Sequence, residues 1–267
     1  MPPQKTSIAR AIIEERFTPD GQDKDPKRDM LASFIRHGIS PNQAIGEADL
    51  QMVAGADTSA TVIRTAILHL LSNPVAYRRL QAEIDSQQQP DNAQIIKDSQ
   101  ARRMPYLQAV ILESLRIAPP LASTLPKVVP PEGDTLLGYF VPGGTEVAWT
   151  IISMCKRKDI FGEDADVWRP ERWLEQDDSP IGLQKLARMN STVDLVFNSG
   201  KWQCLGKHIA LMEFNKIFVE VSDRDPFQGK AERIADKTRA AVQTVRHVDC
   251  QCLQAGGCEL SSCEYFT

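Results

Sequence analysis

The sequence has few of the features that mark a membrane, secreted or nucleic-acid-binding protein. It has no apolar stretch long enough for a membrane span or a signal peptide, and Lys and Arg form no run. Internal repeats are absent, aromatic residues make up only 6% of the 267 residues, and the net charge is −4. We therefore expect no nucleic-acid binding and no membrane anchor within this chain.

Cysteine is scarce in the main body of the chain, which contains only Cys155 and Cys204. Four more lie close together in the tail, at positions 250, 252, 258 and 263, among Gly and Ser residues. These four lack the paired C-x-x-C spacing that is typical of zinc sites. A zinc or disulfide site in the tail is therefore an alternative that the spacing does not favour.

Apolar periodicity predicts a mainly helical fold with a small sheet. Residues 29–41 favour a short helix that Gly38 ends, after which Ser40 and Pro41 supply the cap and first-turn proline of a long helix over 42–72. Further helices are predicted from Pro74 to about residue 87, over 105–117 and over 208–218. Turns at 130–134 and 138–144 flank short predicted strands over 135–137 and 145–149.

The most informative segment surrounds Cys204 in the pattern F-x-x-G-x-x-x-C-x-G, formed by Phe197, Gly200, Cys204 and Gly206. The glycines permit backbone conformations and close approaches that a side chain would block. The helix predicted to follow places its N-terminus near the sulfur, where a thiolate is stabilised. An ordinary buried cysteine beside two turn glycines would give the same pattern. We expect instead a loop that presents one sulfur atom.

This segment resembles the haem-ligand loop of the cytochrome P450 family, in which the cysteine sulfur is the axial ligand of the haem iron. The resemblance implies that Cys204 binds the iron of haem b as a thiolate. It also implies that Phe197, Gly200, Trp202 and Gly206 form the cofactor-binding loop around that ligand.

Trp202 and Lys127 concern the propionate groups of the haem. Trp202 stands where most family members have Arg or His, and an indole cannot pair with a propionate as a cation does. Lys127 matches a basic residue that contacts a propionate in many members, although a charged residue at a strand end is often only solvated. The resemblance implies that Lys127, Lys201 or another cation supplies the anchoring charge.

A second match is Ala54-Gly55-Ala56-Asp57-Thr58-Ser59 on the long predicted helix. This segment is similar to the family's oxygen-binding groove. The similarity implies that Thr58 orients the proton donor and that Asp57 feeds it, in general acid catalysis. A small-residue helix crossing with solvated Asp57 and Thr58 is the alternative.

Two further motifs extend the resemblance. Glu113-Ser114-Leu115-Arg116 is an E-x-x-R whose spacing places both charges on one helix face, and by itself it would also suit an exposed ion pair of small value. Pro170-Glu171-Arg172-Trp173 matches the family's P-E-R-F signature, with Trp in place of Phe. The resemblance implies that Glu113, Arg116 and Arg172 form a structural triad for folding and haem retention.

The motifs occur in family order over about residues 25–221, and several segments look most like fungal microsomal members of the pisatin-demethylase-like group. We therefore predict a mainly α fold with a small β-sheet, the C-terminal half of the P450 fold, over residues 1–221. The remaining residues, 222–267, look unrelated to the family. We expect a divergent, poorly ordered tail that arose by altered splicing, a frameshift or gene degeneration.

The activity that the resemblance implies is haem-thiolate monooxygenation of a small hydrophobic organic substrate, in fungal secondary-metabolite biosynthesis. Electrons would come from NADPH through a cytochrome P450 reductase. A catalytically inactive truncated fragment or an interaction module is the alternative, and a zinc protein that uses the tail cysteines is a third. Family likeness implies the endoplasmic reticulum membrane, whereas a chain without the anchor is expected in the cytoplasm.

Overall fold

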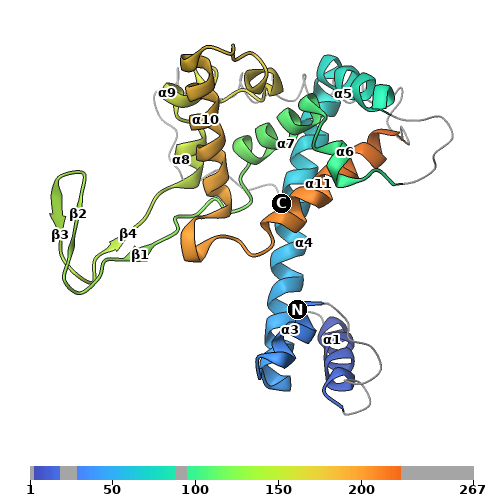
Figure 1. The fold of residues 1–267 in the computed structure, drawn as a ribbon, viewed down its shortest axis with the longest axis vertical. Helices are drawn as coiled ribbons and strands as arrows, with labels where there is room; N and C mark the ends of the chain where they lie inside the picture. The colour runs from blue at the N-terminus through green and yellow to red at the C-terminus, as the bar shows by residue number, and fades with distance from the viewer. Residues whose placement is uncertain (1–2, 19–28, 88–94, 224–267) are drawn as a thin grey trace, which may run out of the picture. The chain divides into compact units, whose positions relative to one another are not determined.

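The computed structural model describes residues 3–18, 29–87 and 95–223 (Figure 1). The chain divides into two compact units, Met1–Ala60 and Thr61–Thr267. Helices make up most of the described chain and the strands are short, so the predicted fold class is confirmed. The four tail cysteines, and the predicted tail beyond Asp223, lie outside the described residues. Of the helices that are described, none combines the length and apolar character that a membrane span needs.

The first unit consists of α1 (Pro3–Arg16), α3 (Met30–Arg36) and the N-terminal part of α4 (Pro41–Ser72). Asp29 begins α3, because its carboxylate accepts the Ala32 backbone N–H at 2.8 Å. A capping box begins α4: the Ser40 N–H donates to Gln43 Oε1 at 3.0 Å, and the Gln43 N–H donates to Ser40 Oγ at 3.4 Å. The unit has a small core of Ile13, Ala44 and Ile45, against which Phe17, Leu31, Ile39 and Ala48 pack.

The second unit is built around α7 (Pro105–Ile117), most of whose side chains are buried. Its neighbours are α5 (Pro74–Gln87), α8 (Ile151–Cys155), η1 (Pro170–Trp173), α10 (Pro180–Asp194) and α11 (Lys207–Asp223). Glu83 of α5 accepts the backbone N–H groups of Tyr106 and Leu107 at 2.9 and 2.8 Å. The Glu83 carboxylate thus caps the N-terminus of α7 and interacts favourably with the positive end of its helix dipole.

The helices α4, α5 and α7 agree well with the sequence predictions, and α5 and α7 begin at the predicted prolines, whereas α1 was not predicted. The helix predicted over 208–218 is longer, since α11 runs over Lys207–Asp223. Sequence reasoning missed α10, although Ser179 and Pro180 mark its start: Ser179 Oγ accepts the Gly182 N–H at 3.1 Å. It also missed α6 (Asp98–Ala101), α8 and α9 (Lys158–Phe161), which are too short to show a helical period.

The strands differ from the prediction. They form two antiparallel pairs, β1 (Lys127–Val128) with β4 (Glu146–Val147), and β2 (Asp134–Leu136) with β3 (Tyr139–Val141). The prediction of a turn over 138–144 was wrong for residues 139–141, which are a strand. The turn lies at Leu137 and Gly138, whose φ values are 52° and 84°. Such a two-residue hairpin turn normally has Gly, Asn or Asp at both positions, so Leu137 concealed it.

Candidate functional site

The segment before Cys204 is folded into two 3-10 turns, η2 (Leu195–Phe197) and η3 (Gly200–Trp202). Between Phe197 and η3 the chain turns sharply, with φ values of 59° at Asn198 and 60° at Gly200. Glycine and, less readily, asparagine tolerate such positive φ values. The Cys204 backbone N–H donates to the Phe197 carbonyl at 2.7 Å and closes the loop. The glycine of the F-x-x-G-x-x-x-C pattern therefore stands where the backbone requires one.

Cys204 is a free, exposed cysteine shortly before Lys207, the first residue of α11. The first turn of a helix has backbone N–H groups without intrahelical acceptors, and its dipole favours negative charge. A Cβ built at Gly206 would meet only Cys204 Sγ, at 3.9 Å. Glycine at 206 therefore leaves the space beside the sulfur open. Neither a steric clash nor a positive φ requires glycine at this position.

Phe197 anchors the loop to the molecule, since its half-buried ring packs against the main hydrophobic core. The chain that follows Cys204 has an apolar exposed face: Leu205 is 77% exposed, Ile209 50% and Met212 37%. Ile209 and Met212 are three residues apart on α11 and so lie on one face of that helix, while Leu205 precedes its first residue. Large apolar side chains that are exposed together indicate a surface that an apolar partner or ligand covers.

Lys127 extends from β1 to the cysteine loop. Its Nζ lies 4.7 Å from the centroid of the Trp202 ring and 5.8 Å from that of Trp149. Lys201 Nζ lies 5.0 Å from the same Trp202 ring. Within the described parts of the chain, neither ammonium group forms an ion pair with a carboxylate. The structure thus brings Lys127 and Trp202, two of the predicted cofactor-binding residues, into contact.

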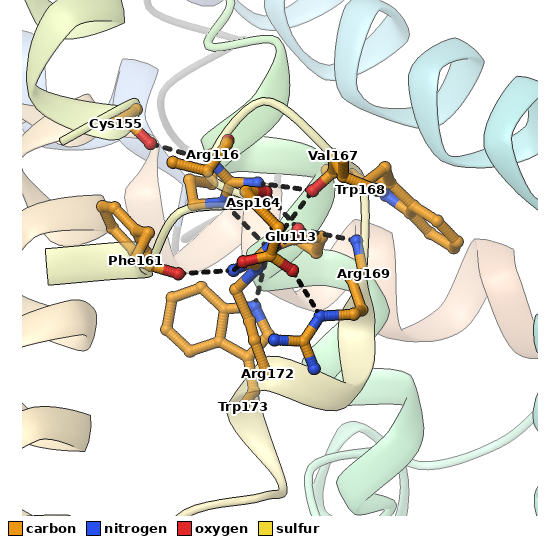
Figure 2. Close-up of polar contacts among 12 residues, drawn as sticks. Glu113, Arg116, Cys155, Phe161, Asp164, Val167, Trp168, Arg169, Arg172 and Trp173 are labelled. Atoms are coloured by element: carbon orange, nitrogen blue, oxygen red, sulfur yellow. Dashed lines mark hydrogen bonds and ion pairs between the residues drawn. The ribbon is translucent and has the colours of Figure 1, made fainter. Parts of the chain in front are cut away.

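Glu113, Arg116 and Arg172 meet where α7 contacts η1 (Figure 2). Arg116 donates to both carboxylate oxygens of Glu113 at 2.9 and 2.8 Å, and Arg172 Nε donates to Glu113 Oε1 at 2.9 Å. The exposed fractions of the three residues are 0%, 0% and 2%. The Glu113–Arg116 pair is therefore a buried ion pair, and the alternative of an exposed pair on a helix surface is wrong.

The groups around the triad satisfy its remaining hydrogen-bonding capacity. Glu113 also accepts the Arg169 backbone N–H at 2.8 Å and the Trp173 indole N–H at 3.0 Å. The two guanidinium groups donate to the backbone carbonyls of Cys155, Phe161, Asp164, Ala165 and Val167. Buried charges are tolerated only when they are paired and hydrogen-bonded in this way. The network ties the segment 155–169 and η1 to α7.

Asp164 is a member of this network that sequence reasoning missed. Its carboxylate accepts hydrogen bonds from Arg172 at 3.0 Å and from Arg169 at 2.6 Å. Burial opposes ionisation of Asp164, but these hydrogen bonds from Arg169 and Arg172 outweigh it, so the pKa of the carboxyl group is lowered. No sequence motif singles out Asp164, because its partners become neighbours only when the loop folds back on η1.

His69 of α4 supports the same region from another side. Its ring stacks on Trp168 with centroids 5.2 Å apart and planes 4° from parallel. The Trp168 indole N–H donates to Ser114 Oγ at 3.3 Å. Burial lowers the pKa of His69, whereas the negative charge of Glu113 acts in the opposite direction. His69 therefore favours its neutral form in the folded protein.

Asp57 and Thr58 lie on α4 in the first unit, whereas the cysteine loop belongs to the second. Thr58 Oγ1 donates to the Ala54 carbonyl, one turn earlier, at 2.6 Å. The hydroxyl proton is therefore engaged, and Oγ1 offers its lone pairs as an acceptor. Thr58 is suited to holding a proton-carrying molecule, while the exposed Asp57 can exchange protons with solvent.

The residues around Cys204 fit a haem group. The exposed sulfur at the start of a helix suits a thiolate ligand of iron. The exposed apolar face of Leu205, Ile209 and Met212 suits the apolar porphyrin, and the ammonium groups of Lys127 and Lys201 suit its carboxylates. A mainly helical fold with such a cysteine loop is typical of haem-thiolate proteins.

Comparison with known proteins identifies the family. The family model described as Cytochrome P450 matches residues 4–221. The chain therefore belongs to the cytochrome P450 family, which confirms the resemblance drawn from its motifs. The match begins well before residue 25, where the sequence motifs had placed its start.

The curated relatives include several fungal P450 monooxygenases. The chain is 43% identical to cytochrome P450 monooxygenase ABA1 of Pyricularia oryzae over 221 residues, which are 82% of this chain and 42% of that protein. It is 37% identical to cytochrome P450 monooxygenase aba1 of Botryotinia fuckeliana over 216 residues, 80% of this chain and 41% of that protein. It is also 37% identical to pisatin demethylase of Fusarium vanettenii over 179 residues, 67% of this chain and 32% of that protein. The chain thus spans less than half the length of these relatives.

Proposed function

We propose that this chain forms the haem-binding part of a cytochrome P450 monooxygenase that acts on a small hydrophobic organic molecule. The observation that carries the proposal is the exposed Cys204 thiol, held in a closed loop at the start of α11. The P450 family match and the fungal monooxygenase relatives support it. We place that substrate in fungal secondary metabolism because the chain is similar to the fungal monooxygenases ABA1 and aba1.

The proposed reaction inserts one atom of O2 into a C–H bond of the substrate and releases the other atom as water. It consumes two electrons and two protons. Haem, when bound, supplies the activation of oxygen that no amino-acid side chain provides. NADPH supplies the electrons through a cytochrome P450 reductase, which is the protein partner that this function requires.

The residues have distinct roles in this proposal. Cys204 holds the haem iron as a thiolate, while Phe197 and Gly200 fix the shape of the loop that presents it. Thr58 Oγ1 accepts a hydrogen bond from a water molecule and so orients its proton, because its own hydroxyl proton is engaged by the Ala54 carbonyl. Asp57, which is exposed, passes protons from solvent to that water.

Glu113, Arg116 and Arg172 act at a distance from the chemistry. Their network holds α7, η1 and the segment 155–169 together. Phe197 packs against the core that α7 helps to form, so the position of the cysteine loop depends on that packing. We assign the triad a role in folding and haem retention.

The test is the carbon-monoxide difference spectrum of the reduced 267-residue chain, expressed with excess haem. A strongly red-shifted Soret band is the expected result, because a Cys204 thiolate that held the haem iron would donate electron density to it. Cys204→Ser should abolish that band. Cys155→Ala is the matched control: Cys155 is the other cysteine among the described residues, it is 1% exposed, and its loss should leave the band in place.

Two results would contradict the proposal. Haem binding with an ordinary Soret position, or a red-shifted band that survives in Cys204→Ser, would show that Cys204 is not the ligand. A folded chain that takes up no haem would favour the inactive-fragment alternative.

A further inference from the structure

Trp202 contacts two positive charges and can neutralise neither. Lys127 Nζ and Lys201 Nζ lie 4.7 and 5.0 Å from the centroid of its ring. An indole has one N–H donor and no acceptor for an ammonium group, so the attraction comes from the negative face of the ring. Lys201 is the sequence neighbour of Trp202, but Lys127 is brought there by β1. The contact with Lys127 is therefore a product of the fold.

A second indole, that of Trp149, lies near Lys127. Its ring lies 5.8 Å from Lys127 Nζ, so Lys127 lies within reach of two indoles. The Trp149 indole nitrogen is buried and has no hydrogen-bond partner among the described residues. A buried donor without an acceptor is destabilising. Among the described residues, Lys127 contacts these aromatic rings and no carboxylate, so its charge is available to an anion.

Two kinds of carboxylate suit the anion at Lys127, one from haem and one from the polypeptide. Lys127 and Lys201 form no ion pair within the described parts of the chain, and Trp202 itself is 57% exposed. The cluster lies at the cysteine loop, since Trp202 ends η3, two residues before Cys204. A haem bound through Cys204 carries two carboxylates on one edge. A carboxylate from elsewhere in the polypeptide has the same chemistry and is the competing occupant.

We propose that Trp202 is a positioning residue that holds the Lys127 ammonium group over its ring, so that Lys127 binds a haem carboxylate. This inference rests on the proposed function. It assigns Trp202 an indirect role, because the indole orients the ammonium group of Lys127, which belongs to β1. The role explains how a haem carboxylate can be bound although position 202 itself has no positive charge.

The experiment measures the rate at which haem leaves the 267-residue chain for excess apomyoglobin. Lys127→Met should accelerate haem loss by roughly tenfold, because a charge-assisted hydrogen bond is removed. Trp202→Ala should accelerate it by about two- to fivefold, the range expected for an exposed cation–π contact. Trp202→Phe, which keeps an aromatic face, should stay close to the unmutated chain.

The double variant Trp202→Ala/Lys127→Met separates positioning from a merely structural role. If Trp202 acts through Lys127, the double variant loses haem no faster than Lys127→Met alone. The same series is loaded with the dimethyl ester of haem, which lacks free carboxylates, and no variant should then differ from the unmutated chain. Lys185→Met, an exposed lysine of α10, controls for the change in net charge.

Two outcomes would overturn the inference while haem binding through Cys204 persists. One is that the single effects multiply in the double variant, and the other is that the variants accelerate loss of the ester as much as loss of haem. The second would show that Lys127 and Trp202 do not act on the haem carboxylates. A chain that takes up no haem at all would overturn the proposed function and this inference together, and the absent Soret band distinguishes that case.

Discussion

Trp173 donates its indole N–H to Glu113 Oε2 at 3.0 Å, although 60 positions separate the two residues in the chain. The same carboxylate accepts two hydrogen bonds from Arg116, one from Arg172 and one from the Arg169 backbone. The signature that the sequence matches has Phe at position 173, which could not donate. The exchange of Phe for Trp therefore adds a donor to a carboxylate that already bridges two buried guanidinium groups.

Trp173→Phe tests the value of that hydrogen bond. The ring remains buried against Phe161, whose centroid is 6.2 Å away, but Glu113 loses one donor. We expect a loss of about 1 kcal/mol in the free energy of unfolding, the usual net contribution of one hydrogen bond. Urea denaturation measures it, with the exposed Trp202→Phe as a control that should show no loss. Equal stability of Trp173→Phe and the unmutated chain would show that the added donor contributes nothing.

Glu113→Gln tests the triad. An amide in this position presents an NH2 group to the guanidinium donors and removes the negative charge that compensates them. We expect the free energy of unfolding to fall by about 3–5 kcal/mol, as for other buried ion pairs with one partner removed. Soluble yield and urea denaturation measure the effect.

The matched control for Glu113→Gln is Glu163→Gln. Glu163 pairs with Lys158, but its side chain is 89% exposed. Loss of this surface pair should leave the unfolding curve unchanged, because exposed ion pairs contribute little. A Glu113→Gln protein as stable as Glu163→Gln would contradict a structural role for the triad.

His69 should make stability depend on pH. Because burial lowers the pKa of His69 below 6.5, the unfolded chain binds a proton at a higher pH than the folded chain does. The unfolded state therefore gains protons first as the pH falls, and the free energy of unfolding should decrease from about pH 7 towards pH 5. Unfolding curves at pH 7.5 and 5.5 measure the change.

His69→Phe keeps a ring against Trp168 but cannot titrate, so the acid-dependent part of the change should be smaller in this variant. A pH dependence identical to that of the unmutated chain would assign the effect to other groups. A histidine paired with an anion would have a raised pKa and would stabilise the fold as the pH falls. The pKa of His69 is lowered instead, because the effect of desolvation outweighs the charge of Glu113.

The two cysteines of the described chain should differ in reactivity. Cys204 is exposed, whereas Cys155 is 1% exposed and burial raises its pKa to about 11, although Arg116 acts the other way. Iodoacetamide reacts with the thiolate, so at pH 8 it should modify Cys204 and leave Cys155 protected. Mass spectrometry of proteolytic peptides measures both. Comparable labelling of the two residues in the folded chain would contradict the structure of the loop.

The helices α4, α5 and α7 could be predicted because their signals are local. Pro74 and Pro105 each stand at the first residue of a helix, and the Ser40-Pro41 pair begins α4. The hairpin of β2 and β3 could not be placed correctly, since Leu137 adopts a positive φ that leucine rarely has. When strand pairing holds a turn in place, the residues of the turn need not have the sequence that is typical of it.

The candidate site was predicted in part. The motif around Cys204 identified the loop, and the two arginine motifs identified three members of the buried network, by resemblance to the family. Asp164, Trp149 and the hydrogen bond of Trp173 were missed. Each of these depends on which side chain of a distant segment lies opposite, and that information is absent from a short motif.

The sequence by itself determined the family and the positions of the main helices, because these depend on short motifs, helix caps and apolar periodicity. Only the tertiary structure decided that Glu113 is fully buried among its donors and that Lys127 lies over Trp202. Such contacts join segments that are far apart in the chain. They form because tertiary packing brings distant segments together, and there the buried charges of the triad find partners that the local sequence does not provide.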